Sequence, residues 1–221
     1  MTRHNEISLY VFDLDGTLLN TLESLYQAGS KLLTALDLPL QPKEAYRHFV
    51  GNGARVLVER LLRANQIEPM HLIEKAYPLY LDYLAIESQQ AIPVYPGIEE
   101  ALFTLLERQK KIAVLTNKPQ AQAEFALAQA LPHLSKQFSC ILGTQANGPV
   151  KPDQGLMNCL LAACQSKAED AVMIGDSDVD VSCGALLGHG CWGCAWGFRG
   201  EEELKKAGAR RILHHARELL D

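Results

Sequence analysis

The chain has 221 residues, of which 48% are hydrophobic and 21% charged, and its formal net charge at pH 7 is −5. This composition is typical of a soluble globular protein of about one or two domains. The acidic balance argues against a nucleic-acid partner, and no apolar run reaches the roughly 20 residues that a membrane-spanning helix needs.

The N-terminal segment and the cysteines give no sign of a secreted, disulfide-bonded protein. Residues 1–6 contain one basic side chain and no apolar stretch of their own, so we expect a cytoplasmic protein without a leader. Four of the six cysteines lie among apolar residues, where a free cysteine behaves as a small hydrophobe. Cys191 and Cys194 have C-x-x-C spacing, but they lie in a strand-like run. A redox motif should open a helix and a zinc site needs a second ligand pair, so any role of this pair stays open.

The first predicted element is a buried strand over residues 7–12, which ends in Asp13-Leu14-Asp15-Gly16-Thr17. Two carboxylates one residue apart raise each other's pKa or recruit a cation. Aspartate, glycine and threonine are also ordinary turn residues, so this segment alone does not decide between a turn and a site.

The next seventy residues contain no convincing strand and have helical spacing instead. Thr21 is expected to cap the first helix, and Pro78 should kink or split the last one. The expected helices cover residues 22–36, 43–49, 54–64 and 70–86. We predict a small all-helical unit inserted after the first strand, joined to the rest by residues 18–21 and 91–97.

The remainder of the chain alternates strand-like and helical segments, which is typical of an α/β protein with a parallel, Rossmann-like sheet. The strands are expected at residues 112–115, 138–142, 171–174, 191–195 and 211–213, and the helices at 98–109, 120–130 and 154–165. We therefore predict an α/β core made of residues 1–17 and 91–221, with a helical cap over residues 18–90.

Polar side chains follow every main strand of this predicted sheet. Thr116 and Asn117 follow the second strand, Lys151 follows the third, and Asp176 and Asp180 follow the fourth. Taken singly, Thr116 could cap a helix and Lys151 could be a solvated lysine. The acidic cluster lacks the twelve-residue pattern of a calcium loop. Because ligands bind beyond the carboxyl ends of parallel strands, the set together predicts a metal and phosphate site.

Four motifs match, in order and spacing, those of the haloacid dehalogenase-like phosphohydrolase superfamily: Asp13-Leu14-Asp15-Gly16-Thr17, Thr116, Lys151-Pro152 and Gly175-Asp176-x-x-x-Asp180. The helical insertion resembles the type-1 cap of that superfamily. Three further segments resemble its phosphoglycolate phosphatase group: Val50-Gly51-Asn52-Gly53-Ala54, Thr116-Asn117-Lys118-Pro119 and Trp196-Gly197-Phe198-Arg199-Gly200. Residues 182–188 depart from that group, because two glycines interrupt a helix that is usually rich in alanine.

The resemblance implies a mechanism and a role for each site residue. Asp13 is the expected nucleophile, forming an aspartyl-phosphate, and Asp15 is the expected acid and base. Mg²⁺ is expected on Asp13, the Asp15 backbone carbonyl and Asp176. The phosphate is expected on Thr116, Asn117 and Lys151, and Asp180 is expected to orient Lys151 or a metal-bound water.

The expected function is hydrolysis of a small phosphorylated metabolite, with 2-phosphoglycolate as the leading substrate. The cap turn Gly51-Asn52-Gly53, with Arg55 beside it, is the candidate substrate contact, although it could be a plain interhelical turn. A pyrophosphatase or nucleotidase, a β-phosphoglucomutase-like phosphotransferase and a catalytically silent binding module remain alternatives. A dehalogenase does not need Asp15, which disfavours that activity. A phosphonate-cleaving enzyme needs a cap lysine, and this cap is poor in lysine, with only Lys31, Lys43 and Lys75, which disfavours that activity too. The oligomeric state stays open between monomer and dimer.

Overall fold

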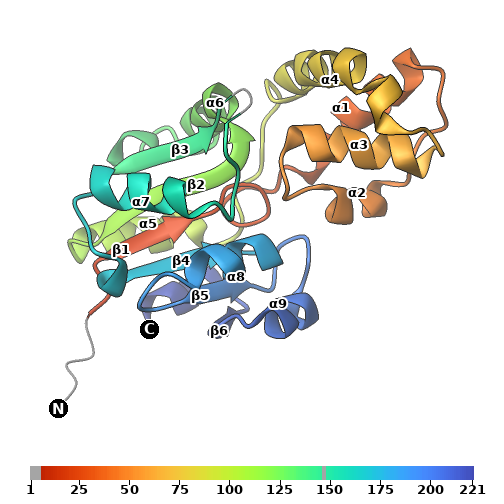
Figure 1. Cartoon of the computed structure of the whole chain (residues 1–221). Helices are drawn as coiled ribbons and strands as arrows, with labels where there is room; N and C mark the ends of the chain where they lie inside the picture. The colour runs from red at the N-terminus through yellow and green to blue at the C-terminus, as the bar shows by residue number, and fades with distance from the viewer. Residues whose placement is uncertain (1–5, 146–147) are drawn as a thin grey trace.

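A computed structural model describes residues 6–145 and 148–221 (Figure 1). The expectation about a leader falls mostly on residues 1–5, and part of the loop before Lys151 falls on residues 146–147; both lie outside the described residues. The core is a parallel sheet whose strands run in the order β3-β2-β1-β4-β5-β6. They are β1 (Leu9–Phe12), β2 (Lys111–Pro119), β3 (Cys140–Thr144), β4 (Ala171–Gly175), β5 (Cys191–Cys194) and β6 (Arg211–Leu213).

The register of the central strands brings their carboxyl ends level with one another. Phe12 pairs with Val114 of β2 on one side and with Ile174 of β4 on the other. The residues that follow these three positions therefore lie at one edge of the sheet. This is the edge at which ligands bind in parallel sheets.

Helices cover both faces of the sheet because successive strand side chains point to opposite faces. Helices α5 (Ile98–Glu107) and α6 (Gln120–Ala130) pack on the face that carries Phe12 and Val114. The opposite face carries Val11 and Leu115. It is covered by α7 (Gln154–Ala163), α8 (Asp178–Gly184) and α9 (Glu201–Ala207). The predicted α/β fold with a parallel sheet is confirmed.

Four helices form a separate hydrophobic cluster away from the sheet (Figure 1, upper right). They are α1 (Leu22–Ala35), α2 (Lys43–Phe49), α3 (Ala54–Ala64) and α4 (Ile73–Glu87), and we call this group the cap helices. The two connecting segments run side by side: the Asn20 N–H donates to the Pro93 carbonyl at 2.8 Å, and the Tyr95 N–H donates to the Leu18 carbonyl at 3.0 Å. The described residues also contain the short 3-10 helices η1 (Pro69–His71), η2 (Ser135–Gln137), η3 (Ala168–Asp170) and η4 (Ala216–Leu220).

Three local predictions differ from the structure in whole or in part. Strand β2 does not end at residue 115 but runs to Pro119 through a register shift against β3, so Thr116 lies within the strand. Helix α4 continues through Pro78, because Tyr80 and Leu84 on its next turn are buried and hold that turn against the other cap helices. Thr21 stands at the start of α1, but its hydroxyl is buried and caps no backbone N–H.

The state of the cysteines and the lengths of the helices agree with what the sequence predicted. All six cysteines are free, and Cys191 and Cys194 are buried in β5, as the strand-like run around them indicated. Cys159 is exposed rather than packed, because it lies on the outer side of α7. Within the described ranges, every helix is too short or too polar to cross a lipid bilayer.

Candidate active site

Lys151 lies between two buried carboxylates at the carboxyl edge of the sheet. Its Nζ is 2.8 Å from Oδ1 of Asp13 and 2.7 Å from Oδ1 of Asp180. Burial opposes the charge of this lysine, but the two carboxylates outweigh it and raise the pKa of Lys151 above its ordinary value. The ammonium therefore stays charged at neutral pH and is held where a negative group beside Asp13 would meet it.

Asp180 is held by hydrogen bonds on both of its oxygens. Its Oδ2 accepts from the Asp176 N–H at 3.2 Å, the Ser177 N–H at 3.1 Å and the Ser177 hydroxyl at 2.7 Å, while Oδ1 accepts from Lys151. Ser177 and Asp180 form the capping box that starts α8. Asp180 thus positions Lys151, and it also links Lys151 to the loop that carries Asp176.

Asp176 is buried against the turn that follows β1. Its Oδ2 accepts a hydrogen bond from the Phe198 N–H at 2.7 Å, and the Thr17 hydroxyl lies 3.5 Å from its Oδ1. Gly16 has φ +89°, and a Cβ there would lie 2.4 Å from Oδ2 of Asp176. Glycine is therefore required at this position both by the turn and by the close approach of the carboxylate.

The acidic residues at this edge fit a divalent cation. One carboxylate oxygen from each of Asp13, Asp176 and Asp180 lies within 4.8 Å of the others, and Lys151 pairs with two of these three carboxylates, Asp13 and Asp180. Burial raises the pKa of Asp13 to about 6, with Asp180 adding to the effect and Lys151 opposing it. Burial likewise raises the pKa of Asp176. Uncompensated negative charge on oxygen donors is the environment that Mg²⁺ favours.

The predicted ligand set and this carboxylate cluster overlap without being identical. Asp13 and Asp176 belong to both, and Asp180 is already occupied by its four hydrogen bonds. Asp15 was predicted to contribute its backbone carbonyl, and it is therefore absent from the cluster of carboxylate oxygens. We therefore keep Asp13, Asp176 and the Asp15 carbonyl as the proposed ligands.

The Asp15 side chain pairs with Lys118, for which no role was predicted. Nζ of Lys118 lies 3.2 Å from Oδ1 and 3.3 Å from Oδ2 of Asp15, and the lysine side chain is only 2% exposed. Thr116, two residues earlier, lines the same pocket, and its hydroxyl accepts from the Lys118 N–H at 3.2 Å. In the sequence, the position of Lys118 directly after Thr116 and Asn117 was the feature that could have predicted this contact.

Asn117 joins the core to the cap helices through its side chain. Its Oδ1 accepts from the Lys151 N–H at 2.7 Å, and its Nδ2 donates to the Gly51 carbonyl at 2.9 Å and the Lys151 carbonyl at 3.3 Å. The side chain is thus fully used within the protein. A contribution of Asn117 to phosphate binding stays a proposal, and it would come from the backbone.

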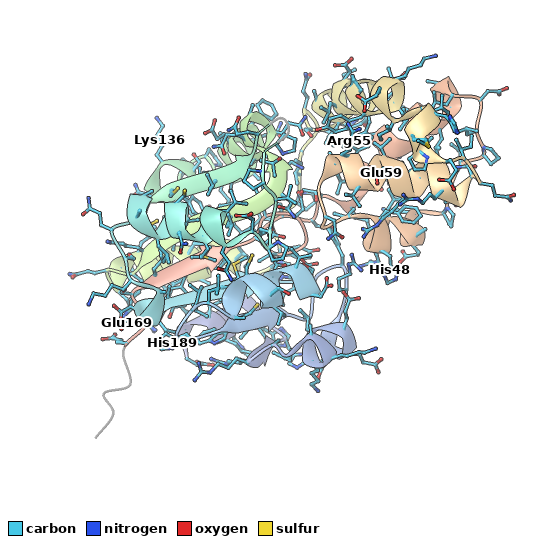
Figure 2. The ribbon with its side chains drawn as sticks, viewed as in Figure 1. His48, Arg55, Glu59, Lys136, Glu169 and His189 are labelled. Carbon is cyan, nitrogen blue, oxygen red and sulfur yellow. The ribbon has the colours of Figure 1, made fainter. Side chains whose placement is uncertain are left out.

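The cap turn is only partly brought to the pocket. Gly51 and Gly53 line it, whereas the Asn52 side chain accepts a hydrogen bond from Arg60 at 2.8 Å. Figure 2 shows Arg55 and Glu59 together on α3. Arg55 pairs with Glu59 and with Glu74 of α4, and its side chain is 41% exposed. The structure therefore does not bring Arg55 or Asn52 to the predicted substrate contact.

A pocket of about 450 Å³, measured to its open mouth, separates the sheet edge from the cap helices. The sheet contributes Asp13, Asp15, Thr116 and Lys118 to its lining. The cap helices contribute mainly apolar side chains together with one hydroxyl, that of Tyr80. The reactive carboxylates thus face a small chamber with one polar wall and one apolar wall.

Comparison with known proteins places this site in a family. The family model described as haloacid dehalogenase-like hydrolase matches residues 10–191. A phosphoglycolate phosphatase of Vibrio parahaemolyticus is 31% identical over 220 residues, which cover 98% of this chain and 96% of that protein. A phosphoglycolate phosphatase of Pseudomonas putida is 32% identical over 96% of this chain and 78% of its own length.

The fold is also found in solved structures. The crystal structure of a predicted phosphoglycolate phosphatase from Haemophilus somnus superposes with a TM-score of 0.88, covering 100% of this chain and 98% of that one at 23% identity. At this identity the likeness concerns the fold. It extends over the sheet, its flanking helices and the cap helices.

Proposed function

Since the chain belongs to the haloacid dehalogenase-like hydrolase family and is a phosphatase, we propose that it hydrolyses a small phosphate monoester, with 2-phosphoglycolate as the first candidate substrate. One observation carries the site assignment: Nζ of Lys151 lies 2.8 Å from Oδ1 of Asp13, and Asp13 lines a pocket together with Asp15. A nucleophilic carboxylate, a charge for the phosphoryl oxygens and an acid thus meet at one point. The phosphoglycolate phosphatases among the relatives support the choice of substrate.

The two aspartates after β1 divide the reaction into two steps. A carboxylate oxygen of Asp13 attacks phosphorus, the bond from phosphorus to the ester oxygen breaks, and Asp15 protonates the departing alkoxide. Asp15 then takes a proton from the water that hydrolyses the aspartyl-phosphate, which restores Asp13 and releases phosphate. Lys118, which pairs with Asp15, keeps its carboxyl group directed into the pocket.

Charge neutralisation is the main task of the remaining groups, because anionic phosphoryl oxygens repel a carboxylate nucleophile. The Lys151 ammonium and the Thr116 hydroxyl bind phosphoryl oxygens, and Asp180 keeps Lys151 in place. Asp13, Asp176 and the Asp15 carbonyl would hold Mg²⁺, which as a Lewis acid stabilises the charge that develops on the phosphoryl group.

The cap helices exclude water from the pocket and contribute to substrate choice. On this reading the chain divides into a core of residues 1–17 and 91–221 and a cap of residues 18–90. We also propose a cytoplasmic location, which the six free cysteines support, since stable disulfides are rare in that compartment.

A panel of phosphate esters, assayed with and without Mg²⁺, tests this proposal. We expect Mg²⁺-dependent release of phosphate, with 2-phosphoglycolate preferred over an aryl phosphate. Equal turnover of both esters would refute the substrate. Preference for a diphosphate or a nucleotide would favour a pyrophosphatase or nucleotidase, and a phosphorylated isomer in place of free phosphate would favour a mutase. No hydrolysis anywhere in the panel would refute the phosphatase assignment.

A further inference from the structure

The Tyr80 hydroxyl is buried beside the site without a hydrogen-bond partner. Tyr80 lies on α4, its side chain is 0% exposed, and the described structure holds no partner for its oxygen. A buried hydroxyl without a partner is unfavourable by the cost of its lost hydration. Because Tyr80 lines the pocket that contains Asp13 and Asp15, a group of the substrate is available to satisfy it.

The N-terminus of α3 opens onto the same pocket. Gly53, which directly precedes this eleven-residue helix, and Ala54, its first residue, both line the pocket. The Leu57 N–H makes the first bond of the helix, to the Gly53 carbonyl, so the N–H groups of residues 54–56 precede the helical ladder. No side chain in the described part of the chain caps them, and the first turn carries no acidic residue. Such a helix end attracts an anion.

The rest of the cap wall is apolar and offers nothing to a large polar substrate. Leu25, Leu57 and Leu84 supply this surface. The hydroxyls of a sugar phosphate would be buried against these leucines without partners, which strongly disfavours such a ligand. A substrate with a short carbon chain and one terminal polar group matches the wall.

We propose that the Tyr80 hydroxyl and the first-turn N–H groups of α3 form an anion subsite, which binds the carboxylate of a small phosphorylated hydroxy acid while the phosphate lies at Asp13. This inference rests on the proposed phosphatase function and adds the groups that recognise the carboxylate of its substrate. The subsite discriminates by charge. A monoester with a methyl group in place of the carboxylate leaves both the hydroxyl and the helix end unsatisfied.

Two matched esters and two matched tyrosines test the subsite. The esters are 2-phosphoglycolate and ethyl phosphate, which share the phosphate and differ in the terminal carboxylate or methyl group. We expect Tyr80→Phe to lower the ratio of kcat/KM for 2-phosphoglycolate to that for ethyl phosphate by about tenfold, mainly through KM. Tyr46→Phe is the control, because Tyr46 is likewise a fully buried tyrosine of the cap helices but does not line the pocket. It should leave the ratio unchanged.

A second pair of variants tests the helix end by its charge. Ala54→Asp places an acid in the first turn of α3, and Ala54→Asn has nearly the same shape without the charge. The aspartate variant should lower the same kcat/KM ratio about tenfold further than the asparagine variant.

The outcomes separate the subsite from the function itself. The wild-type protein could prefer 2-phosphoglycolate while neither Tyr80→Phe nor Ala54→Asp changes the ratio of kcat/KM for the two esters. That result overturns the subsite and leaves the proposed substrate standing. A wild-type protein that turns over both esters equally overturns the proposed substrate and the subsite together. A protein inactive on both esters overturns the phosphatase function.

Discussion

The backbone N–H of Phe198 donates a hydrogen bond to Oδ2 of Asp176 at 2.7 Å, while the Phe198 side chain packs within the hydrophobic cluster of the cap helices. The next residue, Arg199, donates from Nη2 to the Val50 carbonyl at 3.0 Å, just before the cap turn. One short loop after β5 thus contacts both a proposed metal ligand and the cap. We infer that the position of the cap and the position of Asp176 depend on each other.

Shortening Phe198 should weaken both the fold and the metal site. Phe198→Ala removes a buried ring, which typically costs about 3–5 kcal/mol of unfolding free energy. It also loosens the loop that orders Asp176, so the Mg²⁺ concentration for half-maximal activity should rise. Urea unfolding and a Mg²⁺ titration measure the two effects. Phe198→Leu, which keeps most of the volume, should recover both. If Phe198→Ala loses stability while its Mg²⁺ requirement stays the same, the loop serves the fold alone.

Removing the charge of Lys118 should slow catalysis more than it weakens binding. Lys118→Met keeps the length of the side chain but leaves Asp15 without its cation, at 13% exposure and close to Asp13. Because Asp15 is the proposed acid and base, kcat should fall by about a hundredfold, and the pH–rate profile should shift. Lys110→Met is the control, since Lys110 pairs with the exposed Glu6 at 2.5 Å. Equal kinetics in the two variants would show that Lys118 has no part in proton transfer.

Asp13→Asn should abolish hydrolysis while leaving the fold intact. The amide cannot form the aspartyl-phosphate, so we expect kcat to fall at least about a thousandfold, as is usual when a nucleophile is removed. The Lys151 ammonium keeps Asp180 as its partner at 2.7 Å, so circular dichroism should match that of the wild type. Intact-mass spectrometry of quenched reactions should find a phosphoryl adduct on the wild-type chain and none on the variant. Substantial activity in the variant would remove Asp13 from its role.

Local patterns predicted the elements of this fold well, because the information for them is local. The helices at residues 43–49, 54–64 and 120–130 begin and end as the helical spacing indicated. The meeting of Asp13, Lys151 and Asp176 followed from one topological rule, that carboxyl ends of parallel strands share an edge. The spacing over residues 70–86 also predicted α4, but it could not show that the helix continues through Pro78. The packing of Tyr80 and Leu84 against the other cap helices outweighs the unfavourable effect of this proline.

The contacts that sequence reasoning missed depend on tertiary packing. Lys118 reaches Asp15 because β2 shifts register after Leu115, and strand alternation alone does not reveal such a shift. Arg55 follows the cap turn directly and therefore suggested a substrate contact. Its guanidinium instead forms ion pairs with Glu59, one turn later, and with Glu74 of the neighbouring helix.

Mg²⁺ should stabilise the protein strongly near pH 7.5 and weakly near pH 5. In the metal-free protein, burial raises the pKa of Asp13 from 3.8 to about 6 and also raises that of Asp176. The folded state therefore binds more protons than the unfolded state between about pH 4 and 6, so these groups lower stability as the pH rises through that window. Mg²⁺ reverses this penalty above pH 6, where Asp13 is ionised, but must displace protons below it.

Thermal unfolding at several pH values measures this effect. At a Mg²⁺ concentration one hundred times Kd, ligand linkage adds about 2.7 kcal/mol, or roughly 5–10 °C in Tm for a chain of this size. We expect that gain at pH 7.5 and only a small part of it at pH 5. Asp176→Asn should lose both the gain and its pH dependence, because the proposed ligand is gone. A Tm gain that is the same at both pH values, or that survives in Asp176→Asn, would place the metal elsewhere than on these carboxylates.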